Sequence, residues 1–450
     1  MRRSFESLCE NSFKIKPYEI KVVFLAFMYL FCLMASYYIM RPLRDALASE
    51  IASEDLKFLW TATFIVSLIA ALVFGWLVTN FKLSKFLPFV YIFFIFNILG
   101  FYILMRYYPL DGDASVYVPI VKTWPIVFSD TPVSTVVACI YYVWLSVFNM
   151  FVVSIFWSFL ADYFSKEQSK RTFGFIAGGG SLGAALAPLI TAAMVSSIGV
   201  DNLLLIAAMI LAFSLLALKG LIDQASSAHN SITPDLALEN IGGSAWSGFR
   251  NIFKDPFVFG IAIFIVLYTF ISTIFYVAQI DLVRAAFETR EARYAVNAIV
   301  DGIVNCLAIF TQIFITSRIV GVWGIKILLS CIPFFMIFAF FLISLFPVLF
   351  MILFLQIVRR AGNYALTRPG REMIWTVVKR QDKYKTKNVI DTSVYRGADL
   401  VNIWIENGLR STGMGLSQIA LVGSTVAALW FTVAFWLGRR AESGTVTLDK

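Results

Sequence analysis

The sequence predicts an all-α integral membrane protein with twelve transmembrane helices. Hydrophobic residues make up 59% of the 450 residues and charged residues 14%, and the mean hydropathy is +0.79. A soluble chain of this length would need far more polar surface. Apolar windows of about 20 residues, the length that crosses a bilayer, recur along the chain. They lie at about 21–42, 58–80, 86–106, 133–162, 172–197, 202–222, 256–280, 295–317, 326–345, 347–366, 388–409 and 416–437.

The distribution of charge predicts the orientation of these helices. The formal net charge is +9, and Lys and Arg gather in alternate loops, as at Lys85, Lys170 and Arg439. Cytoplasmic loops of membrane proteins carry this excess of cations. We therefore expect a multi-pass protein of a bacterial inner membrane with both termini in the cytoplasm. The basic balance reflects orientation and does not indicate a nucleic-acid partner.

Cysteine and histidine counts narrow the possible chemistry. Four of the five cysteines lie inside predicted spans, namely Cys32, Cys139, Cys306 and Cys331. An odd number in apolar positions argues against a disulfide framework. The one histidine, His229, excludes metal sites built on several histidines and a histidine-based triad in the membrane. We expect neither an enzyme nor a bound cofactor.

The first helix runs into a charged segment, Arg41-Pro42-Leu43-Arg44-Asp45. Proline restricts the residue before it, so the helix should bend or end here. Arg41 and Arg44 either extend to the outer interface or face a central cavity, where they would bind substrate. Asp45 is then a candidate gating residue.

The fourth and fifth helices carry two further signals. Asn149 is a polar residue deep in the fourth helix, and an amide in that position is a candidate for substrate binding. The fifth helix begins with Gly178-Gly179-Gly180-Ser181-Leu182-Gly183, which formally contains GxGxxG. No strand precedes it, so small residues for close helix packing explain it better than dinucleotide binding.

A long polar segment, 223–255, divides the chain into a bundle at 1–222 and a bundle at 256–450. Its end, from Trp246 to Lys254, alternates apolar residues and cations in the pattern of an interfacial helix. We expect it to be a cytoplasmic linker.

The two bundles repeat. Aligning 167–171 with 381–385 also places Gly183 over Gly397 and Asn149 over Asn363. With six helices per half, both copies have the same orientation. The predicted architecture is therefore two six-helix pseudo-repeats of the major facilitator type, with a substrate site between the halves, to which Asn149 and Asn363 contribute.

The tenth helix carries cations that its counterpart lacks, since Leu145 and Ser146 align with Arg359 and Arg360. Arg360, Asn363 and Tyr364 share one helical face with Thr367. A guanidinium, an amide and a phenol suit a phosphate or carboxylate with an attached ring. Asp301 and Asp391 would neutralise the cations when the site is empty. The alternative is that all these groups pair internally and lock the bundle.

Two stretches near the tenth and eleventh helices resemble the nucleotide transporter family, which includes ATP/ADP translocases. They are Arg371-Glu372-Met373-Ile374-Trp375 and a run with Lys383, Lys385, Lys387, Asp391, Arg396 and Gly397. Leu43-Arg44-Asp45 and Arg171-Thr172-Phe173-Gly174-Phe175 resemble two further motifs of that family. The resemblance implies nucleotide exchange. It assigns substrate binding to Arg44 and Arg396, and gating or coupling to Lys385, Lys387 and Asp391. The chain departs from the family at Ala46-Leu47-Ala48-Ser49, so its first-helix cations differ.

Together these patterns predict a secondary active transporter for an organic, phosphorylated anion, with nucleotide exchange as the specific expectation. Its partners would be the anion, the lipid bilayer, and a proton or counter-substrate. Two alternatives stay open: a carrier for another anionic metabolite, and a non-transporting receptor or scaffold. Intramembrane charges such as Asp301 and Arg360 favour transport over the second, because such groups usually mark ion or substrate pathways.

Overall fold

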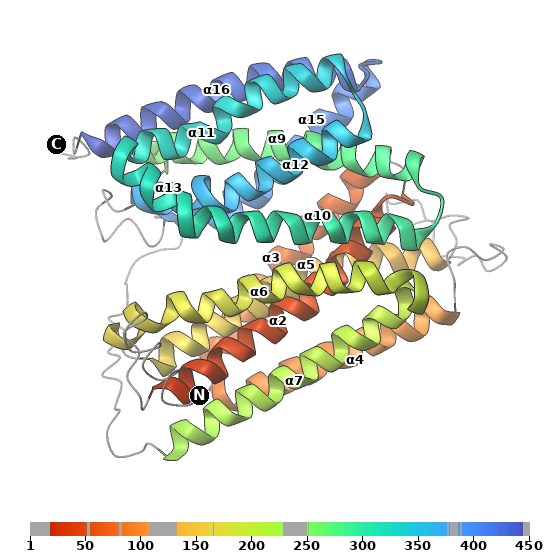
Figure 1. The fold of residues 1–450 in the computed structure, drawn as a ribbon, viewed down its shortest axis with the longest axis vertical. Coiled ribbons are helices and arrows are strands. Elements are labelled where there is room, and N and C mark those ends of the chain that lie inside the picture. Colours follow the sequence, from red (N-terminus) through yellow and green to blue (C-terminus); the bar gives the residue numbers. More distant parts are fainter. Residues whose placement is uncertain are drawn as a thin grey trace. The chain divides into compact units, whose positions relative to one another are not determined.

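The computed structural model describes residues 19–51, 55–80, 83–107, 133–164, 166–227, 252–375 and 389–443, together with 250, 378, 386 and 387. All regular secondary structure in these ranges is helical (Figure 1). Eleven of the described helices are long and apolar enough to cross a membrane. The helices lie where the apolar windows predicted them, and the expected fold class is confirmed.

The first six predicted spans correspond to six helices. They are α2 (Ile20–Ala48), α3 (Leu56–Asn80), α4 (Leu83–Tyr107), α5 (Val133–Tyr163), α6 (Lys166–Ile198) and α7 (Val200–Ser227). The last six correspond to helices interrupted by short π-helical segments. They are α9 (Pro256–Ala286), α10 (Arg290–Thr311) with η1 (Gln312–Thr316), α11 (Ser317–Leu345), α12 (Leu349–Gly362) with η2 (Asn363–Thr367) and α13 (Arg368–Ile374), η4 (Ile390–Val394) with α15 (Tyr395–Ser411), and α16 (Leu416–Glu442).

The segment predicted at 388–409 is helical but more polar than the others. It corresponds to η4 and α15, and α15 is not among the eleven apolar helices. Charged residues recur along it at Arg396, Asp399, Glu406 and Arg410. Asp399 and Glu406 are seven residues apart, so they lie on one face of the helix.

The helices form two compact units. Unit 1 comprises the described residues of Met1–Ile51, Ile65–Ala237 and Glu288–Gly302; unit 2 comprises those of Ala52–Phe64, Leu238–Phe287 and Ile303–Lys450. Two helices are therefore shared. The start of α3 belongs to unit 2 and the start of α10 belongs to unit 1.

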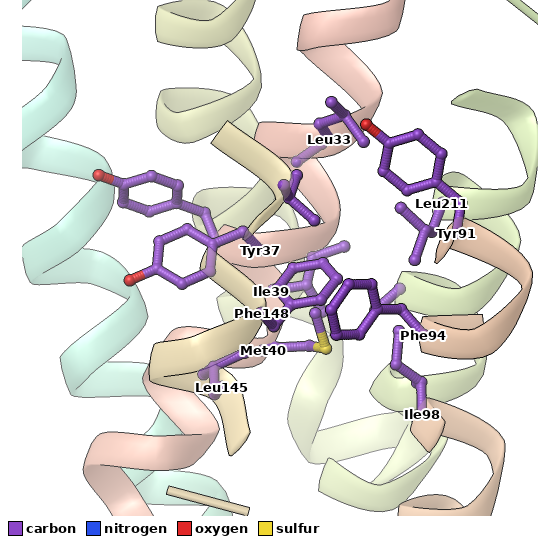
Figure 2. Close-up of a cluster of buried hydrophobic side chains, with 14 of the residues drawn as sticks. Leu33, Tyr37, Ile39, Met40, Tyr91, Phe94, Ile98, Leu145, Phe148 and Leu211 are labelled. Carbon is purple, nitrogen blue, oxygen red and sulfur yellow. The ribbon is translucent and has the colours of Figure 1, made fainter. Parts of the chain in front are cut away.

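Unit 1 is organised around α2, which packs along α6 and α7. A Cβ atom at Gly183 of α6 would overlap the carbonyl oxygen of Phe31 in α2. Close helix approach is thus the role of this glycine-rich segment, as expected. Figure 2 shows the apolar core of the unit, where Phe94 and Phe148 meet above Met40. Their rings lie 5.0 Å apart in an edge-to-face arrangement, a favourable geometry for aromatic pairs.

Unit 2 is organised around α9 and α16, and α11 packs along α16. Trp430 of α16 is fully buried. Its ring lies 5.5 Å from that of Phe264 and 5.8 Å from that of Tyr268, both on α9. This packing fixes the face of α9 that carries Tyr268.

The first helix was predicted to bend or end at Pro42; it does not end there, because α2 continues to Ala48. Leu43, Ala46 and Leu47 are buried, so packing holds this last turn and a half in place. Apolar surroundings favour helix even around proline, since lipid offers no other partner to the backbone. Arg44 and Asp45 are consequently helical residues.

Helix also continues beyond the apolar window predicted at 347–366, through Pro369 to Ile374. A proline inside an α-helix clashes with the carbonyl four residues earlier. Here the preceding turn is the wider η2, and Arg368 N–H bonds to Asn363 O, five residues back. The Ala365 carbonyl accepts instead from Thr316 Oγ1 of η1, at 2.8 Å.

Two expectations concern a segment that the structure describes only in part. Most of the linker at 223–255 lies outside the described residues. Of the expected interfacial helix at 246–254, residues 250 and 252–254 are described, and they are helical. Residues 223–227 of that linker belong to α7.

Candidate functional site

A buried cation lies in the last turn of α12. Arg359 is 2% exposed. The helix α12 that carries it belongs, with η2, to an apolar span that runs from Leu349 to Ile374. The Nε and Nη2 atoms of Arg359 donate to Oε1 of Gln356, at 3.0 and 2.7 Å. Gln356 in turn donates from Nε2 to Oε1 of Gln279 on α9, at 3.0 Å. Both glutamines are buried.

Among the described residues, no carboxylate forms an ion pair with Arg359. Tyr268 acts on it both electrostatically and as a hydrogen-bonding neighbour, and Arg360 and Tyr395 also act on it electrostatically. The Nη1 atom of Arg359 is buried without a hydrogen-bond partner. A buried charge is costly unless it is paired. Intramembrane cations in this state mark pathways or binding sites.

Aromatic rings surround the guanidinium. Its Cζ atom lies 5.4 Å from the centre of the Phe275 ring, within the range of a cation–π interaction. Tyr268 and Tyr395 lie beside it with their rings 6.2 Å apart. Asn363, one helical turn after Arg359, donates from Nδ2 to the Tyr268 hydroxyl oxygen at 3.1 Å. Unit 2 therefore combines one cation, two phenols and three amides in one polar cluster.

The other expected site residues of α12 and η2 lie next to this cluster. Arg360 is buried. Tyr364 is half-buried, and its carbonyl oxygen accepts from Gln312 Nε2 at 3.0 Å. The structure thus brings Asn363 into contact with the Arg359 surroundings and places Arg360 and Tyr364 on the same continuous helix.

Two expected site residues of η4 and α15, Asp391 and Arg396, form ion pairs within unit 2. Asp391 Oδ1 lies 3.4 Å from Nη2 of Arg371, so the expectation that Asp391 neutralises the α12 cations was wrong. Arg371 belongs to α13, one helical turn after Thr367, so this ion pair joins α13 to η4. Arg396 is partly exposed and lies 3.8 Å from Asp399.

Of the two lysines to which the resemblance assigns gating or coupling, Lys385 and Lys387, the second has no contact with the Arg359 cluster among the described residues. Lys387 forms an ion pair with Glu372. Lys385 lies outside the described residues.

Four of the expected site residues of unit 1 form two ion pairs. Nε of Arg41 lies 3.6 Å from Oδ2 of Asp301, whose side chain is 2% exposed. Asp301 therefore forms an ion pair with Arg41, and its expected neutralisation of Arg360 stays a prediction. Arg44 contacts Asp45 at 2.7 Å and lies over the Tyr142 ring. Both arginines are mostly buried, which disfavours the snorkelling alternative, and Asn149 is half-buried in α5.

Sequence reasoning missed Gln356, Gln279 and Tyr268, and it preferred Arg360 to Arg359. One signal was present, because Gln356 and Arg359 are three residues apart in an apolar helix and must share a face. The contacts of Gln279 and Tyr268 with that face cannot be found by spacing, since they lie on another helix.

The fold and these intramembrane charges define a polytopic membrane protein of the transporter type. A model of the Major Facilitator Superfamily matches residues 22–367. The chain belongs to this superfamily.

Solved structures share the fold at low sequence identity. One is a bacterial homologue of the iron transporter ferroportin in an inward-facing state, 11% identical, with 94% of this chain and 100% of that chain covered and a TM-score of 0.65. Another is a POT family transporter in complex with 5-aminolevulinic acid, 12% identical, with 93% and 96% covered and a TM-score of 0.59. A third is a bacterial homologue of the human lysosomal transporter Spinster, 13% identical, with 96% and 100% covered and a TM-score of 0.56. No curated protein matches the chain by sequence.

Proposed function

We propose that the protein is a secondary active transporter that moves a small organic anion across a bacterial inner membrane by alternating access. The observation that carries this proposal is Arg359, a buried guanidinium with no carboxylate partner among the described residues. An anionic substrate would supply the missing negative charge. Membership of the superfamily supports transport as the activity.

The hydrogen-bond donors of Arg359 that Gln356 does not use indicate which chemical group of a substrate this side chain would bind. Nε and one hydrogen of Nη2 are used by Gln356, whereas Nη1 has no hydrogen-bond partner. Arginine binds carboxylate and phosphate groups through two parallel hydrogen bonds. One such group on the substrate is therefore the ligand that this side chain favours.

A phosphorylated substrate, and a nucleotide in particular, is the specific candidate. The resemblance to nucleotide transporters around Arg371-Glu372 and Asp391 supports it, as do the phenol rings of Tyr268 and Tyr395 beside the cation. Aromatic side chains stack on bases. Arg360, Asn363, Tyr364 and Arg396 are proposed to bind substrate with Arg359, as are Arg41, Arg44 and Asn149 of unit 1.

Coupling and topology are part of the same proposal. Asp45, Asp301 and Asp391, with Lys385 and Lys387, are the proposed gating or coupling groups, and a proton or counter-substrate is the coupled species. We place both termini in the cytoplasm and assign 1–222 and 256–450 as the two six-helix halves, joined by the 223–255 linker.

A thermal-unfolding screen of the purified protein tests the proposal. ADP, glucose 6-phosphate, inorganic phosphate and succinate are compared with the neutral molecules adenosine and glucose. A ligand that binds only the folded state raises the unfolding temperature. We expect stabilisation by at least one anion and uptake of that anion into proteoliposomes.

Two variants make the test specific. Arg359→Gln should remove both the stabilisation and the uptake. Arg106→Gln, at the exposed end of α4, should keep them. Stabilisation by the neutral molecules alone, or full anion response in folded Arg359→Gln protein, would refute the proposal.

A further inference from the structure

The acceptor that Gln356 offers to Arg359 is neutral, where a charged acceptor is usual. One oxygen, Oε1 of Gln356, accepts from both Nε and Nη2 of Arg359, at 3.0 and 2.7 Å. A carboxylate commonly occupies this edge of a buried guanidinium, because it both satisfies the donors and cancels the charge. Here the acceptor is a neutral amide, so the donors are satisfied and the charge remains.

The orientation of this amide is determined by its two neighbours. Arginine has only donors, so the amide oxygen of Gln356 must face Arg359. The amide nitrogen then faces Gln279, whose Oε1 accepts from it at 3.0 Å. Gln356 and Gln279 are 3% and 7% exposed, so water does not compete for these positions. The two glutamines thus hold one edge of the guanidinium rigidly.

The edge of the guanidinium that carries Nη1 is left for a ligand by this arrangement. Nη1 is buried without a hydrogen-bond partner, and the guanidinium plane is fixed by Gln356 and by the Phe275 ring at 5.4 Å. A fixed plane matters because a bidentate contact requires the oxyanion and the guanidinium to be coplanar.

We propose that Gln356 is a positioning and specificity-determining residue: it holds the Nε edge of Arg359 with a neutral acceptor, so that the opposite edge, with full positive charge, binds one oxyanion group of the substrate. This inference rests on the proposed anion transport. Its particular content is that an acid at position 356 would pair with Arg359 and exclude anions while the fold stays intact.

The test compares two substitutions with opposite effects on stability. Gln356→Glu is nearly isosteric and places a carboxylate against Arg359. Its unfolding temperature without ligand should equal or exceed that of the wild type, while its affinity for the stabilising probe falls at least tenfold. Gln356→Leu removes the acceptor, so it should lower both the unfolding temperature and the affinity. A merely structural role predicts weaker binding only where the fold is weakened.

The probes are ADP, glucose 6-phosphate and inorganic phosphate, titrated by thermal unfolding and followed by uptake in proteoliposomes. Gln418→Glu is the matched control, because Gln418 caps α16 through the Gly415 N–H and does not contact Arg359. It should bind the probes as the wild type does.

The possible failures are distinguishable. If no anion stabilises the wild type, the proposed function fails and this inference fails with it. If anions stabilise the wild type and Gln356→Glu binds them equally tightly, only this inference is overturned.

Discussion

The Arg41–Asp301 ion pair allows a quantitative prediction about unit 1. Asp301 is 1% exposed, and its carboxylate lies 3.6 Å from Nε of Arg41, whose side chain is 16% exposed. We consider the substitution Asp301→Asn, which keeps the size of the side chain and removes its charge. The cation of Arg41 then remains in a largely apolar environment without this acid.

The expected effect follows from the distance and the burial. At 3.6 Å and an effective dielectric constant of 20, the attraction is about 4–5 kcal/mol. Removing one partner of a buried pair typically costs about 3–5 kcal/mol, because the other charge stays desolvated. The limited exposure of Arg41 lets water reduce this penalty, so we expect a loss of about 3 kcal/mol in the free energy of unfolding.

A double-mutant cycle measures the pair itself. The free energy of unfolding is determined in mixed micelles for the wild type, Asp301→Asn, Arg41→Gln and the double variant. The double variant should lose less than the sum of the single losses, with a coupling energy above about 1.5 kcal/mol. Glu288→Gln, at an exposed position before α10, serves as the control and should change stability little. A coupling energy below about 0.5 kcal/mol would refute the reasoning.

Three further predictions follow from other parts of the chain. Gly183→Ala should destabilise the protein, because its Cβ would overlap the Phe31 carbonyl, whereas Gly178→Ala, with open space, should not; equal unfolding temperatures would contradict this. Arg360→Lys should weaken anion uptake roughly ten- to a hundred-fold, since a charge-assisted hydrogen bond is worth about 1.5–3 kcal/mol; unchanged uptake by the folded variant would exclude Arg360 from the site. In a cysteine-free background, an impermeant thiol reagent applied to intact cells should label a cysteine at Asp111 and not one at Ser227; the reverse pattern would overturn the proposed orientation.

The positions of the helices could be read from the sequence because the bilayer enforces them. A backbone in lipid must satisfy its own hydrogen bonds, so an apolar window of sufficient length becomes a helix whatever its neighbours are. This is why the windows at 256–280 and 416–437 agree with α9 and α16. The same constraint explains why helix continues past Pro42 and Pro369. Proline rules describe chains that can exchange a lost backbone bond for water, and Pro42 and Pro369 lie in packed helices.

Helix ends and π-helical turns depended on contacts between elements. The turn at η2 places Pro369 beyond a wide ring, and Thr316 and Gln312 of η1 satisfy the carbonyls of Ala365 and Tyr364. Residues 312 and 365 are far apart in the chain. A local sequence pattern cannot predict whether a side chain of another helix will donate a hydrogen bond to a carbonyl that has lost its helical partner.

The candidate site divides in the same way. The sequence by itself determined that the segment at 347–366 carries two cations where the aligned segment of the first half has Leu145 and Ser146, and that Asn363 shares their helix. Only the tertiary structure decided which cation lacks an acid. Asp391 pairs with Arg371 and Asp301 with Arg41, whereas Arg359 meets the amides of Gln356 and Gln279. The reason is physical: the helical period fixes which residues share a face, but the partner that each face meets depends on how the helices pack.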